Sequence, residues 1–272
     1  MDKRVEIFYH VIMLGFVLRK TFYDMWDNIL RIAALNLGFI AVLTIPVFLP
    51  MLAANIINSM LLHTVFSVFG ILACSVYLSA AALCVKSISD YGSFGFIDFL
   101  RNFKTAWPAG LVMGIFVILL YMVIPNIIWF YLHIESLVGL GLAAIVFWLT
   151  IFALLSFQFY FSVYSRLGAK MVKSFNKCMI ISMDNSGFSL FLFLNNIVVL
   201  IISAVFAFMF PGPVGILLYL DEALRLRLLK YDWLEANPGA DRRKIPWDVL
   251  LMEEREKTGH RSFMNFIFPW KD

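Results

Sequence analysis

The sequence predicts an all-α protein, a polytopic bundle of about six transmembrane helices with amphipathic interfacial helices and a short cytoplasmic tail. The 272-residue chain is 62% hydrophobic and only 15% charged, whereas soluble domains are nearer ~45–50% apolar and ~25% charged. It contains several apolar runs of about 20 residues, the length that a helix needs to cross a bilayer. Its 22 Lys and Arg residues lie in segments that can all be placed on one side of a membrane, as the positive-inside rule requires.

The charge distribution predicts three parts. Residues 1–31 mix apolar and charged side chains, which predicts an amphipathic helix lying on the inner leaflet. Residues 32–230 contain the long apolar runs and predict the transmembrane helix bundle. Residues 231–272 are soluble in composition and predict a cytoplasmic tail, with a turn at 237–239 and one short helix over 246–257.

Six membrane passes are predicted within the bundle, over residues 32–52, 60–85, 108–131, 137–162, 187–210 and 214–229. Connections near Asn58 and Ser136 contain no Lys or Arg and are placed outside, whereas those that contain Lys86, Lys177 and Lys230 are placed inside. The last pass is purely apolar only over 214–220, so it must be shielded by protein or lie in a thinned bilayer. This topology places both termini in the cytoplasm.

Two apolar surfaces on the cytoplasmic side are candidates for docking a partner. In the loop 87–107, aromatic residues recur on one face of a predicted interfacial helix, and Pro108 is expected to open the next span. The end of the chain, 263–270, is densely apolar and needs a partner surface, either the membrane or protein. The candidate partner-docking residues are Phe99, Phe103, Phe266, Phe268 and Trp270.

Asp221 and Glu222 are the strongest candidates for an intramembrane polar site, because ionisable groups within a span are costly and mark functional sites. The competing and favoured interpretation is structural, since Arg225 follows at positions that allow local pairing on one helix face. The amides Asn36 and Gln158 complete this candidate site, either through interhelical hydrogen bonds or by lining a polar path.

No motif for a cofactor, a metal or nucleic acid is present. The sequence contains no Walker loop, and its four histidines lie in separate segments without metal-ligand spacing. Aromatic and basic residues are not interleaved as in RNA-binding modules. The cysteines Cys74, Cys84 and Cys178 are widely spaced, which predicts buried thiols. We therefore expect no cofactor, no metal and no nucleic-acid partner, and a surface in contact with membrane lipids.

Several segments occur in an order that resembles one family. They are Phe22–Trp26, Leu35–Leu37, Ser79–Leu83, Phe96–Lys104 with Trp107, and Phe159–Leu194. Together they resemble the YesL-like bacterial integral membrane proteins, a domain of unknown function, over about residues 20–230. The chain departs from that family at Ser79, where proline is usual, and in its long tail after Lys230. The resemblance implies a bacterial inner-membrane location and a role beside carbohydrate uptake, and it implies no catalytic residues.

Three functions follow from these patterns. The favoured expectation is a non-enzymatic accessory or scaffold subunit of a bacterial ABC-type carbohydrate-uptake system, with the sugar permease or its ATPase as partner. The second is a small solute transporter or channel that uses Asp221 and Glu222. The third, a membrane enzyme acting on lipid-linked substrates, ranks last because the sequence contains no visible nucleophile or metal cluster.

Overall fold

The computed structural model describes residues 3–52, 60–134, 136–168, 170–241 and 245–259. Over these residues the chain is helical and contains no strand, which confirms the predicted all-α class. Within the described residues, five helical segments are long and apolar enough to cross a membrane, namely Ile29–Leu52, Leu61–Ser89, Phe96–Leu132, Leu137–Leu167 and Ser186–Val205. These segments indicate a multi-pass membrane protein and correspond to the first five predicted passes.

Two compact units divide the described chain, one formed by residues 24–221 and the other by the residues up to Tyr23 together with those from Glu222 onward. The helices in chain order are α1 (Lys3–Asp27), α2 (Ile29–Leu52), α3 (Met60–Ser89), α4 (Phe96–Ile118), a π-helical turn (Leu119–Val123), α5 (Ile124–Leu132), α6 (Leu137–Phe157), α7 (Tyr160–Leu167), α8 (Met171–Asp184), α9 (Ser186–Val205), α10 (Gly212–Ala236), α11 (Trp247–Leu250) and α12 (Met252–Thr258).

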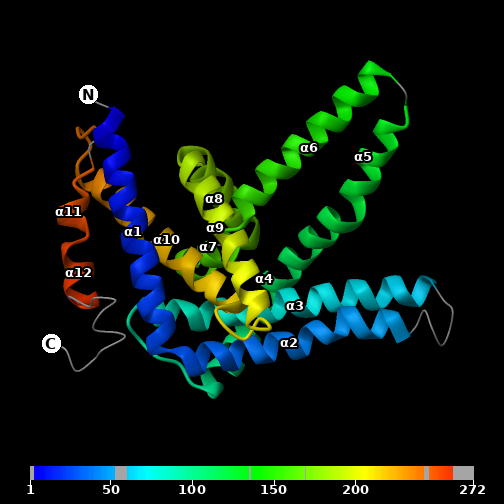
Figure 1. Ribbon diagram of the computed structural model, residues 1–272, viewed down its shortest axis with the longest axis horizontal. Coiled ribbons are helices and arrows are strands. Elements are labelled where there is room, and N and C mark those ends of the chain that lie inside the picture. Colours follow the sequence, from blue (N-terminus) through cyan, green and yellow to red (C-terminus); the bar gives the residue numbers. More distant parts are fainter. Residues whose placement is uncertain (1–2, 53–59, 135, 169, 242–244, 260–272) are drawn as a thin grey trace. The chain divides into compact units, whose positions relative to one another are not determined.

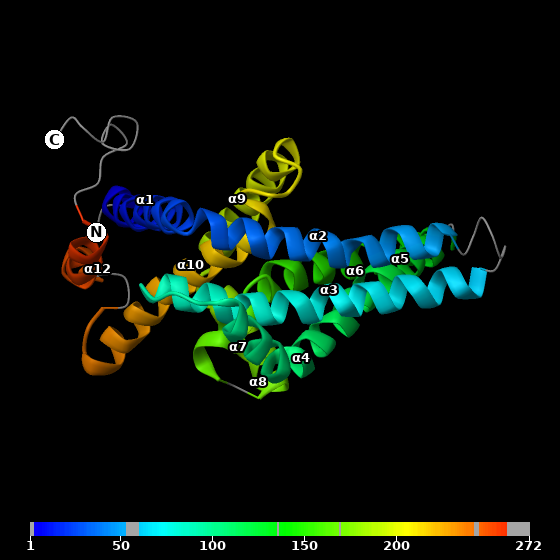
Figure 2. The same ribbon diagram turned by 90° about the horizontal axis from the view of Figure 1, so that it is seen from below.

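In the larger unit, α3 lies between α2 and α4 and packs against both, as Figures 1 and 2 show from two directions. Small residues allow α3 and α4 to approach closely. A Cβ atom added at Gly110 would lie only 2.4 Å from the Cα atom of Val76, and one at Gly114 would lie 2.8 Å from a methyl of Leu72. The Ser79 hydroxyl also donates to the carbonyl of Ala106 at 3.0 Å. These contacts are the small-residue packing common between membrane helices.

The loop between α3 and α4 differs from its prediction. A separate interfacial helix followed by a span that opens at Pro108 is wrong, because α4 begins at Phe96 and continues through Pro108. The helix start is defined at Gly95, whose N–H donates to the Asp98 carboxylate at 2.9 Å. A proline inside a helix removes one backbone hydrogen bond, and the other turns of this 23-residue helix maintain it.

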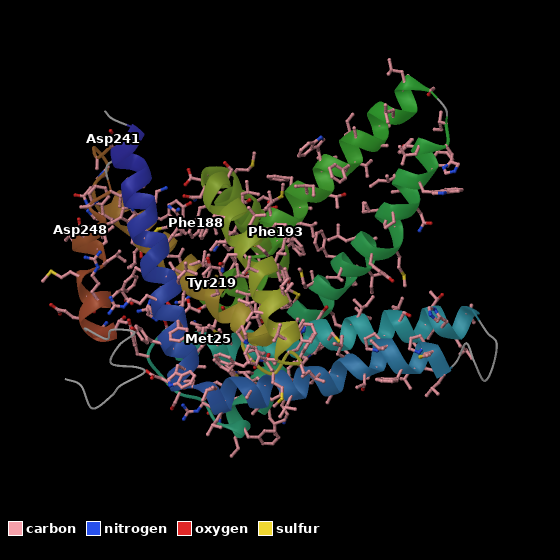
Figure 3. All side chains as sticks on the ribbon, viewed as in Figure 1. Met25, Phe188, Phe193, Tyr219, Asp241 and Asp248 are labelled. Carbon is pink, nitrogen blue, oxygen red and sulfur yellow. The ribbon has the colours of Figure 1, made fainter. Side chains whose placement is uncertain are left out.

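The third span changes its winding before it ends. A π-helical turn over Leu119–Val123 precedes α5, and Pro125 lies in the first turn of α5. The wider turn relieves the clash between the proline ring and the carbonyl four residues earlier. Beyond this turn, α5 and α6 meet at their connection, where Gly139 lies against the Tyr131 carbonyl. Figure 3 shows side chains projecting along both helices, and many of these are exposed apolar residues suited to lipid contact, such as Trp129 and Trp148.

In the smaller unit, the predicted tail helix is broken. Residues 246–257 form α11 and α12, separated at Leu251, and Pro246 caps α11 instead of lying within a longer helix. The predicted turn at 237–239 is confirmed, since the Ala240 N–H donates to the Asn237 carbonyl at 3.0 Å. The helix predicted for residues 1–31 is present as α1 but ends at Asp27, and residues 29–31 belong to α2. Its contact with the inner leaflet stays a prediction.

Candidate functional site

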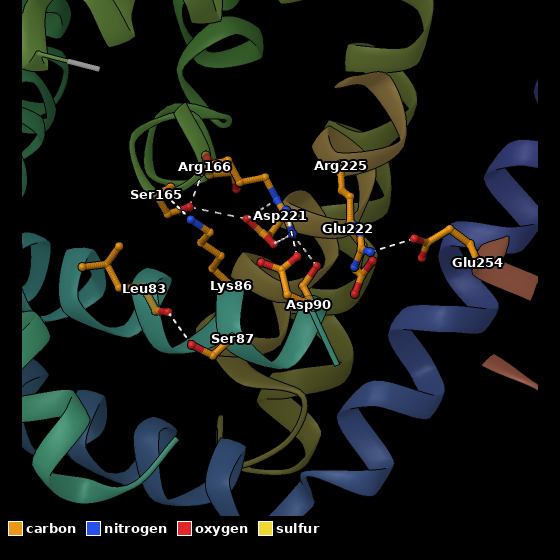
Figure 4. Close-up of polar contacts among 12 residues, drawn as sticks. Leu83, Lys86, Ser87, Asp90, Ser165, Arg166, Asp221, Glu222, Arg225 and Glu254 are labelled. Carbon is orange, nitrogen blue, oxygen red and sulfur yellow. Dashed lines mark hydrogen bonds and ion pairs between the residues drawn. The ribbon is translucent and has the colours of Figure 1, made fainter. Parts of the chain in front are cut away.

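A buried ion pair joins α7 to α10 in the larger unit. The Asp221 side chain is 2% exposed and the Arg166 side chain 9% exposed. Arg166 Nε donates to Asp221 Oδ1 at 3.0 Å, and Nη2 donates to Oδ2, so the guanidinium and the carboxylate meet at two points. Such bidentate pairs are the strongest charge-assisted contacts that side chains make. Figure 4 shows this contact in close-up.

The same guanidinium also holds the end of α3. Its Nη1 donates to Asp90 Oδ1 at 3.1 Å and its Nη2 donates to the Ser89 hydroxyl at 2.6 Å. Next to it, Lys86 Nζ donates to the backbone carbonyl of Ser165 at 2.9 Å. Arg166 therefore ties α3, α7 and α10 together through one cationic group. We call Lys86, Ser89, Asp90, Arg166 and Asp221 the Arg166 network.

The neighbouring acid belongs to the smaller unit and has a different partner. Glu222 pairs with Lys20 of α1, and both side chains are 1% exposed. One turn further along α10, Arg225 Nη2 donates to Glu254 Oε1 of α12 at 2.7 Å. Arg227 lies with its guanidinium 5.9 Å from the centre of the Trp247 ring. These contacts attach α1 and α12 to the second half of α10.

The predicted local pairing of Asp221 with Arg225 is wrong. The carboxylate of Asp221 binds Arg166, which lies 55 positions earlier in the sequence, and Arg225 binds Glu254. Both acids do pair with cations of other helices, Asp221 with Arg166 of α7 and Glu222 with Lys20 of α1. A buried carboxylate needs a hydrogen-bonded cation in a fixed place, and a helix that is packed against this one supplies that more rigidly than a flexible side chain one turn away.

Asn36 stabilises the start of α10. Its amide nitrogen donates to the carbonyls of Met209 and Pro211 at 3.0 and 2.8 Å, and its amide oxygen accepts the N–H of Val214 at 3.0 Å. The side chain is fully buried. Gly212 completes the contact, because its φ is +64° and an added Cβ would lie 2.4 Å from the Asn36 amide. The role of Asn36 is therefore to hold a turn by hydrogen bonds.

Gln158 makes the interhelical hydrogen bonds expected of a span amide. Its nitrogen donates to the Ser189 carbonyl at 2.9 Å, and its oxygen accepts from the Asn196 amide at 3.2 Å. These bonds join the end of α6 to α9. Asn36 and Gln158 do not contact Asp221, so the five residues proposed as one polar site are distributed over several separate contacts in the described chain.

The candidate docking residues also differ from one another. Phe99 is half-buried, with its ring centre 5.2 Å from that of Tyr77, so it contributes to the packing of α4 on α3. Phe103 is 41% exposed and remains available to lipid or a partner. Phe266, Phe268 and Trp270 lie outside the described residues.

Sequence reasoning missed the cations of these contacts. Arg166 and Lys20 lie in basic segments next to apolar runs, where a cation indicates only the topology. Asp90 lies in the polar loop 87–107, where no sequence pattern marks it. The signal available for Arg166 was its position directly after the span 137–162, since a cation at the end of an apolar helix is a ready partner for an acid in a neighbouring span.

A polar pocket of about 400 Å³ lies beside the Arg166 network, between the end of α3 and the start of α4. It shares Lys86 and Asp90 with the network and is also lined by Asp98, Arg101 and Asn102. Over the part of the chain that the structure describes, no group of three or more His, Cys, Asp or Glu side chains is placed to hold a metal ion.

Comparison with known proteins returns no family model, no curated protein and no solved structure that matches the chain. The resemblance to the YesL-like family therefore stays a prediction, which depends on the ordered segments described above.

Proposed function

We propose that this chain is a non-enzymatic integral membrane protein that serves as an accessory or scaffold subunit of a bacterial ABC-type carbohydrate-uptake system. The observation that supports this proposal is the Arg166–Asp221 pair. The carboxylate of Asp221 is buried and accepts two hydrogen bonds from the guanidinium of Arg166, one of them at 3.0 Å. Such a fixed contact suits a side chain that holds helices together. An acid that carries a proton or an ion through a transport cycle must instead exchange partners.

A scaffold also needs a surface for its partner. At the start of α4, Leu100, Phe103 and Trp107 are exposed at successive turns of one side of the helix. Exposed aromatic clusters of this kind are typical of protein or lipid contacts. The carbohydrate class and the ABC-type partner come from the resemblance to the YesL-like family, and the permease or its ATPase is the partner that we propose.

The experiment compares binding with transport. The tagged chain is purified from its own bacterial membrane in mild detergent, and the permease and ATPase subunits are quantified by mass spectrometry. We expect the permease to co-purify in a stoichiometric amount. It should be lost in Phe103→Asp but not in Val172→Asp, which introduces the same charge at a more exposed apolar position on α8.

The second arm places the purified chain alone in liposomes with labelled di- and trisaccharides. A scaffold gives no flux above that of empty liposomes. Sugar flux that disappears in Asp221→Asn would contradict the scaffold proposal and establish the chain as a transporter in its own right.

A further inference from the structure

The pocket between α3 and α4 contains charges of both signs within one small volume. Lys86 and Arg101 contribute the cations and Asp90 and Asp98 the carboxylates. A purely basic pocket would favour a simple anion, whereas this one offers adjacent positions for an anion and a cation. The chemistry therefore suits a zwitterion whose two charges are separated by a few bonds. Its volume of about 400 Å³ lies in the range of small-molecule sites.

Several of these groups retain hydrogen-bonding capacity toward the pocket. Lys86 Nζ uses one donor on the Ser165 carbonyl, and an ammonium has three. Arg101 is 75% exposed and lies 3.9 Å from Asp98, beyond hydrogen-bond distance. Asn102 donates one N–H to the sulfur of Cys84, which leaves the second N–H of its amide as a donor. Lys86, Arg101 and Asn102 therefore supply the donors of the pocket, and the carboxylates of Asp90 and Asp98 supply the acceptors.

The position of the pocket in the chain places it at the depth of lipid headgroups. The 30 residues of α3 extend over about 45 Å, which exceeds the ~30 Å hydrocarbon core. The last turns of α3, with Lys86, therefore reach the polar layer on the predicted cytoplasmic side. On α4, the exposed side chains of Phe103 and Trp107 follow Asn102 of the pocket by one and five residues toward the core, at the level where acyl chains begin.

We propose that this pocket binds the headgroup of phosphatidylethanolamine. The phosphate is held by Lys86, Arg101 and Asn102, and the primary ammonium donates to Asp90 and Asp98. The acyl chains extend from the pocket toward the membrane core. A quaternary ammonium has no N–H to donate, so phosphatidylcholine fits the carboxylates less well, and an anionic headgroup such as phosphatidylglycerol meets two carboxylates without a cation of its own.

Native mass spectrometry of the full-length chain, released from detergent micelles that contain equal amounts of the three lipids, tests this proposal. We expect phosphatidylethanolamine to be retained about tenfold more than either other lipid, the equivalent of one specific contact pair. Arg101→Gln and Asp98→Asn should each weaken its retention about fivefold, as expected for loss of one partly exposed ion pair. Asp98→Asn preserves the acceptor for the Gly95 N–H, so the start of α4 stays intact.

Lys173→Gln is the matched control, because Lys173 is an exposed cation on α8 of the same unit. It should leave the lipid preference unchanged. Soluble glycerophosphoethanolamine is a further probe. Its competition with the lipid would show that the headgroup alone is recognised, and the lack of competition would show that the acyl chains are also required. Equal retention of all three lipids, a preference for phosphatidylglycerol, or the same losses in Lys173→Gln as in Arg101→Gln would overturn the proposal.

Discussion

Arg166 and Asp221 form a bidentate ion pair between the end of α7 and α10, and 55 positions separate them in the sequence. Because the same guanidinium holds Asp90 and Ser89 at the end of α3, one side chain connects three helices. Removing one member of a buried pair leaves the other charge without compensation. The pair is therefore the contact of the larger unit on which mutation should have the greatest effect.

Replacing Arg166 with Gln should lower the free energy of unfolding by about 3–5 kcal/mol, the usual effect of breaking a buried pair. Asp221→Asn should lower it less, because Arg166 keeps its contacts with Asp90 and Ser89. Denaturant titration in mild detergent measures both. The exposed Arg255–Asp248 pair of the smaller unit provides the control, since Arg255→Gln should change stability by only ~0–1 kcal/mol. Equal effects of Arg166→Gln and Arg255→Gln would show that the network contributes no special stability.

Asn36→Ala should destabilise the protein by about 1–3 kcal/mol, because it leaves two carbonyls and one N–H without their partner in a buried turn. Asn126→Ala is the matched control, since Asn126 is exposed and its amide bonds only within its own helix. Gly212→Ala should be at least as harmful as Asn36→Ala, because it introduces both a steric clash and a strained φ. Wild-type melting behaviour of Gly212→Ala would contradict this description of the turn.

Phe99 and Phe103 should respond differently to the same change. Phe99→Ala should cost about 1–3 kcal/mol, less than a fully buried phenylalanine, because its half-buried ring packs on Tyr77. Phe103→Ala should leave stability unchanged within about 0.5 kcal/mol, as surface substitutions do. Thermal unfolding of the two purified variants checks this. A destabilised Phe103→Ala protein with a normal Phe99→Ala protein would reverse the assignment of packing and docking roles.

The three thiols should be inert in the folded protein. All of them are buried, as the sequence predicted. In α8, outside the spans, burial raises the pKa of the Cys178 thiol to about 12. The unreactive neutral thiol is therefore the dominant form of Cys178 at pH 8. At pH 8, maleimide should leave the three thiols of the folded protein unmodified and should label them once the protein is denatured.

Asn176→Cys provides the positive control for labelling, because Asn176 is exposed on the same helix. Its cysteine should react rapidly under native conditions. Rapid labelling of Cys178 in the unmodified chain, at a rate similar to that of the introduced cysteine, would show that α8 opens to solvent.

The spans could be predicted from the sequence because their signal is local. A run such as 137–162 is apolar in itself, and flanking cations report its orientation without knowledge of its neighbours. Ion-pair partners depend on which helices are adjacent in space. Lys20 and Glu222 are 202 positions apart, so only the tertiary arrangement brings them together. The same reason explains why the predicted pair of Asp221 and Arg225 is absent, since the spacing rule for helices considers residues of one helix alone.

The continuity of α4 through Pro108 illustrates a different limit. Proline is a strong local signal for a helix boundary, and it favoured two helices over one. The structure instead starts the helix at Gly95, where Asp98 satisfies the first backbone N–H. A signal for a helix start at Gly95 and a signal for a helix boundary at Pro108 therefore occur within 14 residues. Which of them prevails depends on the packing of Gly110 and Gly114 against α3.

Whether α10 crosses the membrane decides if the chain has five or six passes. Val214, Leu218 and Leu220 of this helix are buried, so its short apolar stretch has the protein shielding that a sixth pass requires. A reporter inserted into the exposed turn at Asn237–Ala240 keeps α12 and its Glu254 contact with Arg225. It should report the cytoplasm, as should a reporter after Lys177, whereas reporters near Asn58 and Ser136 should report the outside. The reason is that Arg225, Arg227 and Lys230 belong on the positive side. An extracytoplasmic signal at the Asn237–Ala240 turn, with a cytoplasmic signal after Lys177, would leave five passes and place these three cations outside.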